Sequence, residues 1–412
     1  MHCINKTALV IAAFSLLPAC AVNEVITAEE TELVVAETPP DEGQLLDIGI
    51  VQFAEGIPKD NDPAESGVYE EIRSAESRYL AYHLKTTLQG TGHWGAVRVI
   101  PSRDAFTDVI ISAAIEESDG EFITLDVSVG DARGKTWYRK SYSTQTGVSS
   151  YSINRDRRQD PYQKVFNDIA NDLRAYVATM PPQSITEIRQ VSELQFFADM
   201  SPQAYGEHLA RDEEGILRVV RLPAENDPAV DRLRQIRERD RLVVDTLNEH
   251  YANFYYGIAI PYSSWRKTAR EESINYRQVK RSAALQTLMG AVVLAGSLAV
   301  DTDHGGRQSR SVNRGLQSIG IQQGFETMMR GFTRRSEASM HLESIKELSE
   351  SFGAEAAPMV VSVEGQSRRL TGTAAAQYES WRRLLKEIYA TETGFTETAA
   401  DSAPERVPEP AG

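Results

Sequence analysis

The sequence predicts an α+β protein, in which a small module of strands and helices over residues 45–182 precedes a mainly helical region. Two observations carry this prediction. Inside the module, several short runs alternate apolar and polar residues, as half-buried strands do, while two longer runs repeat apolar residues every three to four positions, as amphipathic helices do. From residue 185 onward the helical repeat dominates, until a β-hairpin and one more helix near the end of the chain.

The module is predicted to follow the order β-α-β-β-β-β-α. Gly, Pro and Asp-Gly signals separate the runs, because these residues favour tight reversals of the chain. His83 falls on the apolar face of the first helix, and Val165, Ile169, Leu173 and Val177 form the apolar stripe of the second. Strands are predicted over residues 46–53, 96–100, 109–115, 122–129 and 137–142, and helices over residues 69–88 and 160–178.

Residues 183–357 are predicted to form the mainly helical region. A helix over residues 229–256 should end at Pro261, since proline removes a helix hydrogen bond, and a second helix should cover residues 262–300. Arginine-rich runs within residues 232–241 and 266–281 are interleaved with acids. They are interpreted as solvated helix faces with ion pairs, or alternatively as a docking face for an acidic partner or lipid headgroups.

Small residues mark the end of this helix and a third helix that follows it. Glycine costs about 1 kcal/mol in a helix interior, so three glycines on one face indicate that another backbone packs very near. A close-packed helical hairpin is therefore predicted over residues 283–335, and it fits a buried helix pair, self-association of several copies or membrane insertion. The predicted helix-packing residues are Thr287, Ala291, Ala295, Ala299, Gly320, Gly324 and Gly331.

The last ordered unit is predicted over residues 358–394, as a β-hairpin followed by a helix that Thr373 caps. An aromatic and aliphatic stripe on this helix is interpreted as core, with docking of a partner protein as the alternative. The stripe consists of Tyr378, Trp381, Leu384, Leu385, Ile388 and Tyr389. Residues 395–412 are rich in Ala, Pro and Glu and are predicted to be disordered.

The first twenty residues have the pattern of an export signal. Lys6 gives a positive start, and the apolar run over residues 8–17 is too short to span a bilayer. The segment closes on Leu17, Pro18, Ala19 and Cys20, which resembles the lipobox of bacterial lipoproteins. The resemblance implies that the signal peptide, residues 1–19, is cut off, and that Cys20 receives a diacylglyceryl group and a further acyl chain such as palmitate. An ordinary secretory signal is the alternative.

The same resemblance implies a location. Alanine rather than aspartate at position 21 favours the outer membrane, so the protein is expected on its periplasmic face, held by the lipid. Cleavage discards Cys3 and lipidation consumes Cys20, so the mature chain would keep no free thiol in an oxidising compartment. Residues 20–44 are acidic and contain two adjacent prolines, which predicts a flexible tether, with a short strand at residues 33–35 as the alternative.

A second resemblance concerns the module itself. Its order of elements, the strand at residues 108–111 and the turns at residues 118–120 and 131–134 are similar to a periplasmic α+β module. This module occurs in the curli secretion lipoprotein, in lipoproteins auxiliary to lipid transporters, and as the N-terminal domain of the Tol-system β-propeller protein. The resemblance implies a domain that holds partners or assembles.

Composition and motifs argue against several classes of function. A formal net charge of −15 disfavours nucleic acid as a partner. The sequence contains no Walker loop, HExxH, GxSxG or dinucleotide fingerprint. None of its seven histidines lies near another histidine or a cysteine at metal-ligand spacing, so no metal, cofactor or catalytic residue is assigned. His208 and Asp212 would share one face of a helix, but without a nucleophile this pair predicts no activity.

Taken together, the patterns predict a lipid-anchored cell-envelope protein that acts as a non-catalytic scaffold or assembly factor facing the periplasm. Its expected partners are the membrane, through the lipid, and either another protein or further copies of the same chain. An oligomeric envelope channel or secretion component is the first alternative, and a hydrolase with a dispersed active site is the second.

Overall fold

The computed structural model describes residues 30–38, 40–59, 68–103, 105–152, 159–298, 343–347, 350, 359–363 and 366–393 of the 412-residue chain. In the long helix that ends at residue 298, side chains are described as far as Asn275 and at Arg277. The predicted signal peptide, the predicted tail and most of the predicted 283–335 hairpin lie outside the described residues.

A five-stranded mixed sheet forms the centre of the fold, with the strand order β2-β1-β3-β4-β5. β1 pairs in parallel with both β2 and β3, and β3, β4 and β5 continue as an antiparallel meander. The predicted α+β class is therefore confirmed, and so is the predicted order of strands and helices in the module. The strands are β1 (Ile48–Val51), β2 (Val97–Ile100), β3 (Val109–Ser118), β4 (Phe122–Asp131) and β5 (Thr136–Gln145).

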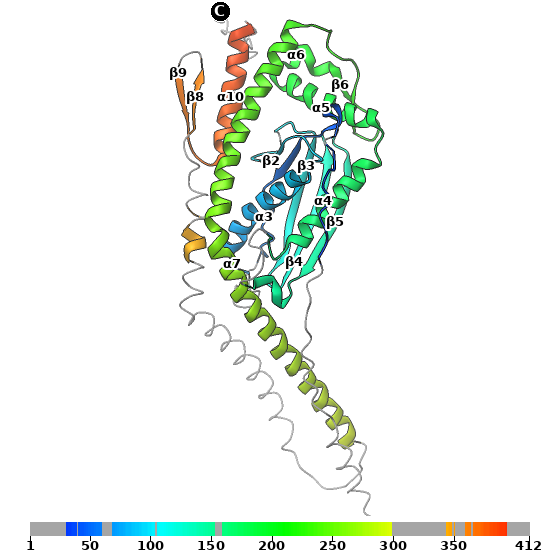
Figure 1. Ribbon diagram of the computed structural model, residues 1–412, viewed down its shortest axis with the longest axis vertical. Coiled ribbons are helices and arrows are strands. Elements are labelled where there is room, and N and C mark those ends of the chain that lie inside the picture. The colour runs from blue at the N-terminus through cyan, green and yellow to red at the C-terminus, as the bar shows by residue number, and fades with distance from the viewer. Residues whose placement is uncertain are drawn as a thin grey trace, which may run out of the picture.

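Two helices, α3 (Glu70–Thr91) and α4 (Gln163–Ala178), cover one face of this sheet (Figure 1). The alternation in the strands sets this arrangement, because every second side chain of β3 and β4 is buried against the helices. On α4 the predicted stripe is in the core: Val165, Ile169 and Leu173 are fully buried. Most side chains on the opposite face of β3 and β4 are polar, including Ser112, Thr124 and Asp126, which is typical of an antiparallel sheet open to solvent on one side.

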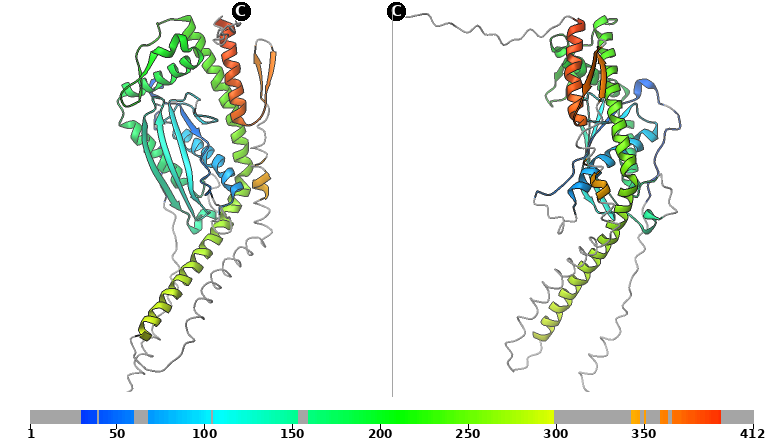
Figure 2. Two further views of the ribbon diagram at one scale, coloured as in Figure 1. Left: turned by 180° about the vertical axis from the view of Figure 1, so that it is seen from behind. Right: turned by 90° about the vertical axis from the view of Figure 1, so that its left-hand side faces the viewer.

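The longest element is α7, a helix of 71 residues from Pro228 to Leu298 that extends well beyond the sheet (Figure 2). The prediction that Pro261 ends a helix is wrong, since the helix continues through it. A proline inside a helix costs about 3 kcal/mol, but residues on both sides of this one are anchored in the core. Ile258, Tyr262 and Trp265 are each buried to 97% or more against the module, which keeps the chain helical through the proline.

α7 also protects the open edge of the sheet at β2. The side-chain amide of Asn248 donates to the carbonyl oxygen of Val99 at 2.9 Å and accepts from its N–H at 2.8 Å, so it replaces a neighbouring strand. Arg98 of β2 forms a two-point ion pair with Asp245 one turn earlier. The helical region thus shares its cores with the module, and helix α5 (Pro182–Met200) contributes to the same cores.

The helical prediction fails between α5 and α7. After α5 and the short α6 (Pro202–Tyr205), strands β6 (Leu209–Arg211) and β7 (Leu217–Val219) form a hairpin. His208 and Asp212 therefore do not share a helix face. Asp212 instead accepts hydrogen bonds from the N–H groups of Glu214 and Ile216, which is the local turn chemistry that favours a hairpin.

The terminal unit agrees with its prediction. β8 (Met359–Val363) pairs with β9 (Gln366–Leu370), and α10 (Ala374–Thr393) follows. The hydroxyl of Thr373 caps this helix, because its oxygen accepts a hydrogen bond from the N–H of Ala376 at 3.2 Å. The aromatic stripe is core, as interpreted: Tyr378 and Trp381 are buried against α7 and donate to the carboxylate of Asp240.

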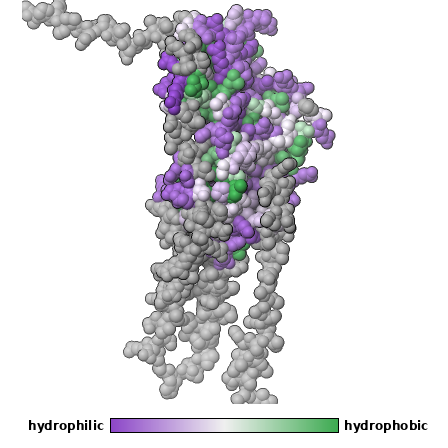
Figure 3. Space-filling model, turned by 60° about the vertical axis from the view of Figure 1, so that its left-hand side comes forward, coloured by the Kyte–Doolittle hydropathy of each residue, from purple (hydrophilic) through white to green (hydrophobic). Residues whose placement is uncertain are grey.

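On the face of the molecule shown in Figure 3, hydrophobic side chains of described residues appear as small separate groups among hydrophilic ones.

Part of the segment predicted to be a flexible tether is fixed to the module. We call residues 31–36 the strap. Asn167 of α4 donates to the carbonyl of Thr31 at 2.7 Å, and Asn171, one turn later, donates to the carbonyl of Glu32 and accepts from the N–H of Val34. The N–H of Ala36 donates to the last carbonyl of α3 at 2.8 Å, and the strap is not a strand.

Candidate functional site

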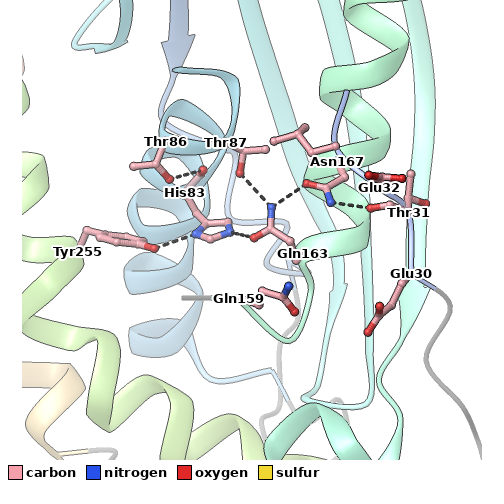
Figure 4. A pocket seen from close by; sticks show the side chains of 11 residues that line it. Glu30, Thr31, Glu32, His83, Thr86, Thr87, Gln159, Gln163, Asn167 and Tyr255 are labelled. Carbon is pink, nitrogen blue, oxygen red and sulfur yellow. Dashed lines mark hydrogen bonds between the residues drawn. The ribbon is translucent and has the colours of Figure 1, made fainter. Parts of the chain in front are cut away.

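A pocket of about 750 Å³ lies between the strap, α3, the start of α4 and one face of α7 (Figure 4). Its walls are polar: amides, hydroxyls, the carboxylates of Glu30 and Glu32, one histidine and one tyrosine. Leu33 adds an apolar side chain. The lining residues are Glu30, Thr31, Glu32, Leu33, His83, Thr86, Thr87, Gln159, Gln163, Asn167 and Tyr255.

His83 is the central group of this pocket. It is 5% exposed, and both of its ring nitrogens are engaged, Nδ1 with the hydroxyl of Tyr255 at 2.8 Å and Nε2 with Oε1 of Gln163 at 2.9 Å. Because the amide nitrogen of Gln163 donates to Thr87 and to Asn167, its oxygen must accept, which assigns the proton to Nε2 of the neutral ring. Nδ1 then accepts from Tyr255.

The protonation states of these two groups follow from burial. Burial lowers the pKa of His83 below its ordinary value of 6.5, so the ring is neutral at pH 7. Burial, together with the nearby carboxylate of Asp160, raises the pKa of Tyr255 to about 12, so the phenol keeps its proton. A polar chain of fixed direction therefore runs from Tyr255 through His83, Gln163 and Asn167 to the strap (Figure 4).

A second pocket, of about 690 Å³, adjoins the first and shares His83, Thr86, Gln159 and Tyr255 with it. It continues between α7 and the described residues 150–152 and 159–161. Its further walls are rich in hydroxyl groups and aromatic rings, from Ser150, Tyr151, Ser152, Tyr256, Ser263 and Ser264, with Ala259 and Ile260 as apolar contacts. We call the two pockets together the His83 groove.

A buried charge cluster forms the floor of the groove and joins α7 to the module. Arg266 donates two hydrogen bonds to the carboxylate of Asp160, at 2.8 and 2.9 Å, and the rings of Tyr162 and Tyr262 lie against its guanidinium. Arg266 is 1% exposed. The interpretation of the second arginine-rich run as a solvated face is thus wrong at this position.

Glu76 of α3 lies in the same cluster. Its Oε1 accepts from the hydroxyls of Ser118 and Tyr262, at 2.6 and 2.7 Å. Burial raises the pKa of Glu76, although Arg73, whose Nη1 lies 3.8 Å from Oε2, opposes the rise. Three chain segments far apart in sequence are therefore joined by charge and hydroxyl contacts beneath the groove.

None of the residues predicted to form sites is among the described residues that line the His83 groove. Leu17, Pro18, Ala19 and Cys20 precede the described residues. Thr287, Ala291 and Ala295 belong to α7 by their backbone, while their side chains are outside the description, and Ala299, Gly320, Gly324 and Gly331 follow its last described residue. The sequence placed His83 correctly on the buried face of its helix but gave no sign of Tyr255, which is 172 residues away.

Comparisons with family models, curated proteins and solved structures gave no match for this chain. Among the described residues, no helix is both long enough and apolar enough for a membrane crossing. The same part of the chain holds no group of three or more His, Cys, Asp or Glu side chains placed to bind a metal ion.

The strap contacts give a first testable prediction. Asn171→Ala removes the side chain that bonds the strap at Glu32 and Val34, so the strap should detach and residues 31–36 should be cut faster by a non-specific protease. Asp168→Ala on the same helix is the control, because it removes an ion pair with Lys164. Mass spectrometry of the fragments identifies the cut sites. Equal cleavage of both variants within residues 31–36 would show that the strap is held by other contacts.

Proposed function

We propose that this chain is a lipid-anchored cell-envelope protein that acts as a non-catalytic scaffold or assembly factor on the periplasmic face of the outer membrane. One observation carries the anchor: an apolar run of signal-peptide length closes on Leu17, Pro18, Ala19 and Cys20. A diacylated and acylated Cys20 would bear three chains, and two are enough for stable attachment.

The strap supports this proposal by limiting how far the folded domain can move from its anchor. Eleven residue steps separate Cys20 from Thr31, and a fully extended chain covers about 3.6 Å per step, so the domain would stay within about 40 Å of the lipid. Because the strap is bonded to α3 and α4, the anchor would leave the domain beside the His83 groove. The groove would then face a defined direction relative to the membrane.

The chemistry of the groove supports a binding role in preference to catalysis. A general base needs a free nitrogen within reach of the substrate, and both nitrogens of His83 are occupied by Tyr255 and Gln163. Tyr255 keeps its proton and uses it in the bond to His83. These groups hold one another in place, which suits a surface that keeps its shape.

Metabolic labelling tests the anchor. Cells that express the full chain and are grown with labelled palmitate should incorporate label into the protein, and the Cys20→Ala variant should not. Globomycin, which blocks the lipoprotein signal peptidase, should cause the precursor to accumulate. Absence of label together with processing that ignores globomycin would reject the proposal.

The second candidate is an oligomeric envelope channel or secretion component. The observation that favours it is the length of α7, which continues well beyond the sheet domain and carries the small residues Thr287, Ala291 and Ala295 near its end (Figure 2). Light scattering coupled to size exclusion distinguishes the two candidates, using the full chain with Cys20→Ala. A ring of defined size favours the channel, and a monomer at high concentration favours the scaffold.

A further inference from the structure

We propose that the His83 groove is a binding site for a neutral, unphosphorylated oligosaccharide. The proposal goes beyond the role suggested above and does not depend on the lipid anchor, since it is argued from the described residues of the groove alone. Three properties carry it: the shape of the groove, its charge, and the kind of polar and aromatic groups that line it.

The shape favours a chain-like ligand. Ligand pockets commonly enclose about 300–1,000 Å³, and the two halves of the groove, at about 750 and 690 Å³, each fall in this range. They share His83, Thr86, Gln159 and Tyr255, and beyond these residues one half is lined by residues 30–33 and α4, the other by α7 and residues 150–152. A compact metabolite would fill one half, whereas a linear chain of several similar units would fill both.

The charge of the described lining residues disfavours anionic ligands such as nucleotides, phosphorylated sugars and lipid headgroups. Among its described lining residues Arg266 is the one cation, and both of its terminal nitrogens are bonded to Asp160. Two carboxylates, those of Glu30 and Glu32, stand at the rim and are exposed. Among these described lining residues a phosphate would find no free cation, and it would meet two like charges.

The free polar groups suit sugar hydroxyls. The amide of Gln159 lies in the groove and makes no hydrogen bond within the described part of the chain (Figure 4). Thr86 donates to the carbonyl of His83 and keeps its lone pairs, while Thr87 accepts from Gln163 and keeps its hydrogen. With the carboxylate of Glu32, these groups offer donors and acceptors without a compensating positive charge, which neutral hydroxyls match.

Aromatic rings complete the site. Tyr255 stacks on Tyr79 at 4.6 Å between ring centroids and is fixed by its bond to His83, so its position is set before a ligand arrives. Tyr256, beside it, is 67% exposed, whereas tyrosine side chains are usually more buried than this. Its ring is available to the apolar C–H face of a pyranose, and Ile260 one turn later extends the same surface.

Titration of the full chain with Cys20→Ala by calorimetry tests the proposal, with maltotriose, cellotriose, tri-N-acetylchitotriose and mannotriose as neutral probes. At least one should bind. Gln159→Ala should weaken that binding about 3- to 10-fold, the effect of one neutral hydrogen bond. Tyr256→Ala should weaken it similarly, and Tyr256→Phe should restore it, because the ring and not the hydroxyl makes the contact.

Two controls make the outcome decisive. Asp126→Asn, on the open face of the sheet, should bind the probe as the parent does, and all variants should unfold at the parent's urea midpoint. Glucose 6-phosphate and spermidine serve as anionic and cationic probes. If none of the four saccharides binds, or if one binds equally well to the Gln159 and Tyr256 variants, the proposal is wrong. Binding of spermidine alone would mark the groove as an amine site instead.

Discussion

Replacing Gly120 with alanine should destabilise the protein by about 3 kcal/mol or more, because it adds both backbone strain and a steric clash. Gly120 has a φ of +84° in the turn between β3 and β4. A Cβ at this position would lie 2.2 Å from the carbonyl oxygen of Arg266 and 2.7 Å from the backbone nitrogen of Arg270. The turn meets the backbone of α7 here, and neither side can withdraw without opening the core.

Gly134→Ala is the matched control for this prediction. Gly134 has a φ of +85° in the turn between β4 and β5, but the nearest atom to its added Cβ would be Nη1 of Arg211, at 3.8 Å. The control should therefore lose only about 1 kcal/mol, the cost of a left-handed conformation in a residue with a side chain. Urea unfolding of both variants measures the difference, and equal losses would show that α7 does not press on the first turn.

The second large effect is expected at the buried ion pair. Arg266→Met leaves the carboxylate of Asp160 uncompensated in the core, and the removal of one partner of a buried pair costs about 3–5 kcal/mol. Asp160→Asn combined with Arg266→Met should be more stable than Arg266→Met alone, because the amide carries no charge. Its oxygen can still accept from the N–H of Tyr162, and its NH2 group can donate to the hydroxyl oxygen of Tyr79. A double variant as unstable as the single one would contradict this account.

The ion pair between Arg266 and Asp160 should also make the stability of the protein depend on pH. Burial alone would raise the pKa of Asp160, but the charge and hydrogen bonds of Arg266 lower it below its ordinary value of 3.8. The stability that this group contributes is then complete above pH 3.8 and is lost as the pH falls toward the lowered pKa. Glu76 acts in the opposite sense, since its pKa is raised, so the comparison must be made against the Asp160→Asn, Arg266→Met double variant. Its unfolding free energy should fall less between pH 5 and pH 3 than that of the parent.

The elements of the module were predictable because local chemistry determines them. In β3 and β4 the alternation of apolar residues matches the single buried face of the sheet. The turns follow from aspartate side chains that bond their own loops: Asp119 accepts from the N–H groups of Glu121 and Phe122, and Asp131 accepts from that of Arg133. Each of these signals lies within a few residues of the structure it sets.

The features that the sequence did not reveal depend on partners far away in the chain. Arg266 looks like other arginines of its run until Asp160, 106 residues earlier, is placed beside it. Pro261 is a helix breaker by local chemistry, and the core contacts of Ile258 and Tyr262 override it. The His83 groove unites the strap, α3, α4 and α7, so no single stretch of sequence carries its pattern. Proline rules, charge spacing and histidine spacing are local, and these sites are not.

The most direct test of the account is the mass of the mature protein extracted from cell membranes with detergent. We expect the mature chain to begin at Cys20 and its N-terminal peptide to carry a diacylglyceryl group and one further acyl chain. A mature N-terminus at any other residue, or an unmodified Cys20, would contradict the lipid anchor, and with it the position that we propose for the strap and the groove beside a membrane.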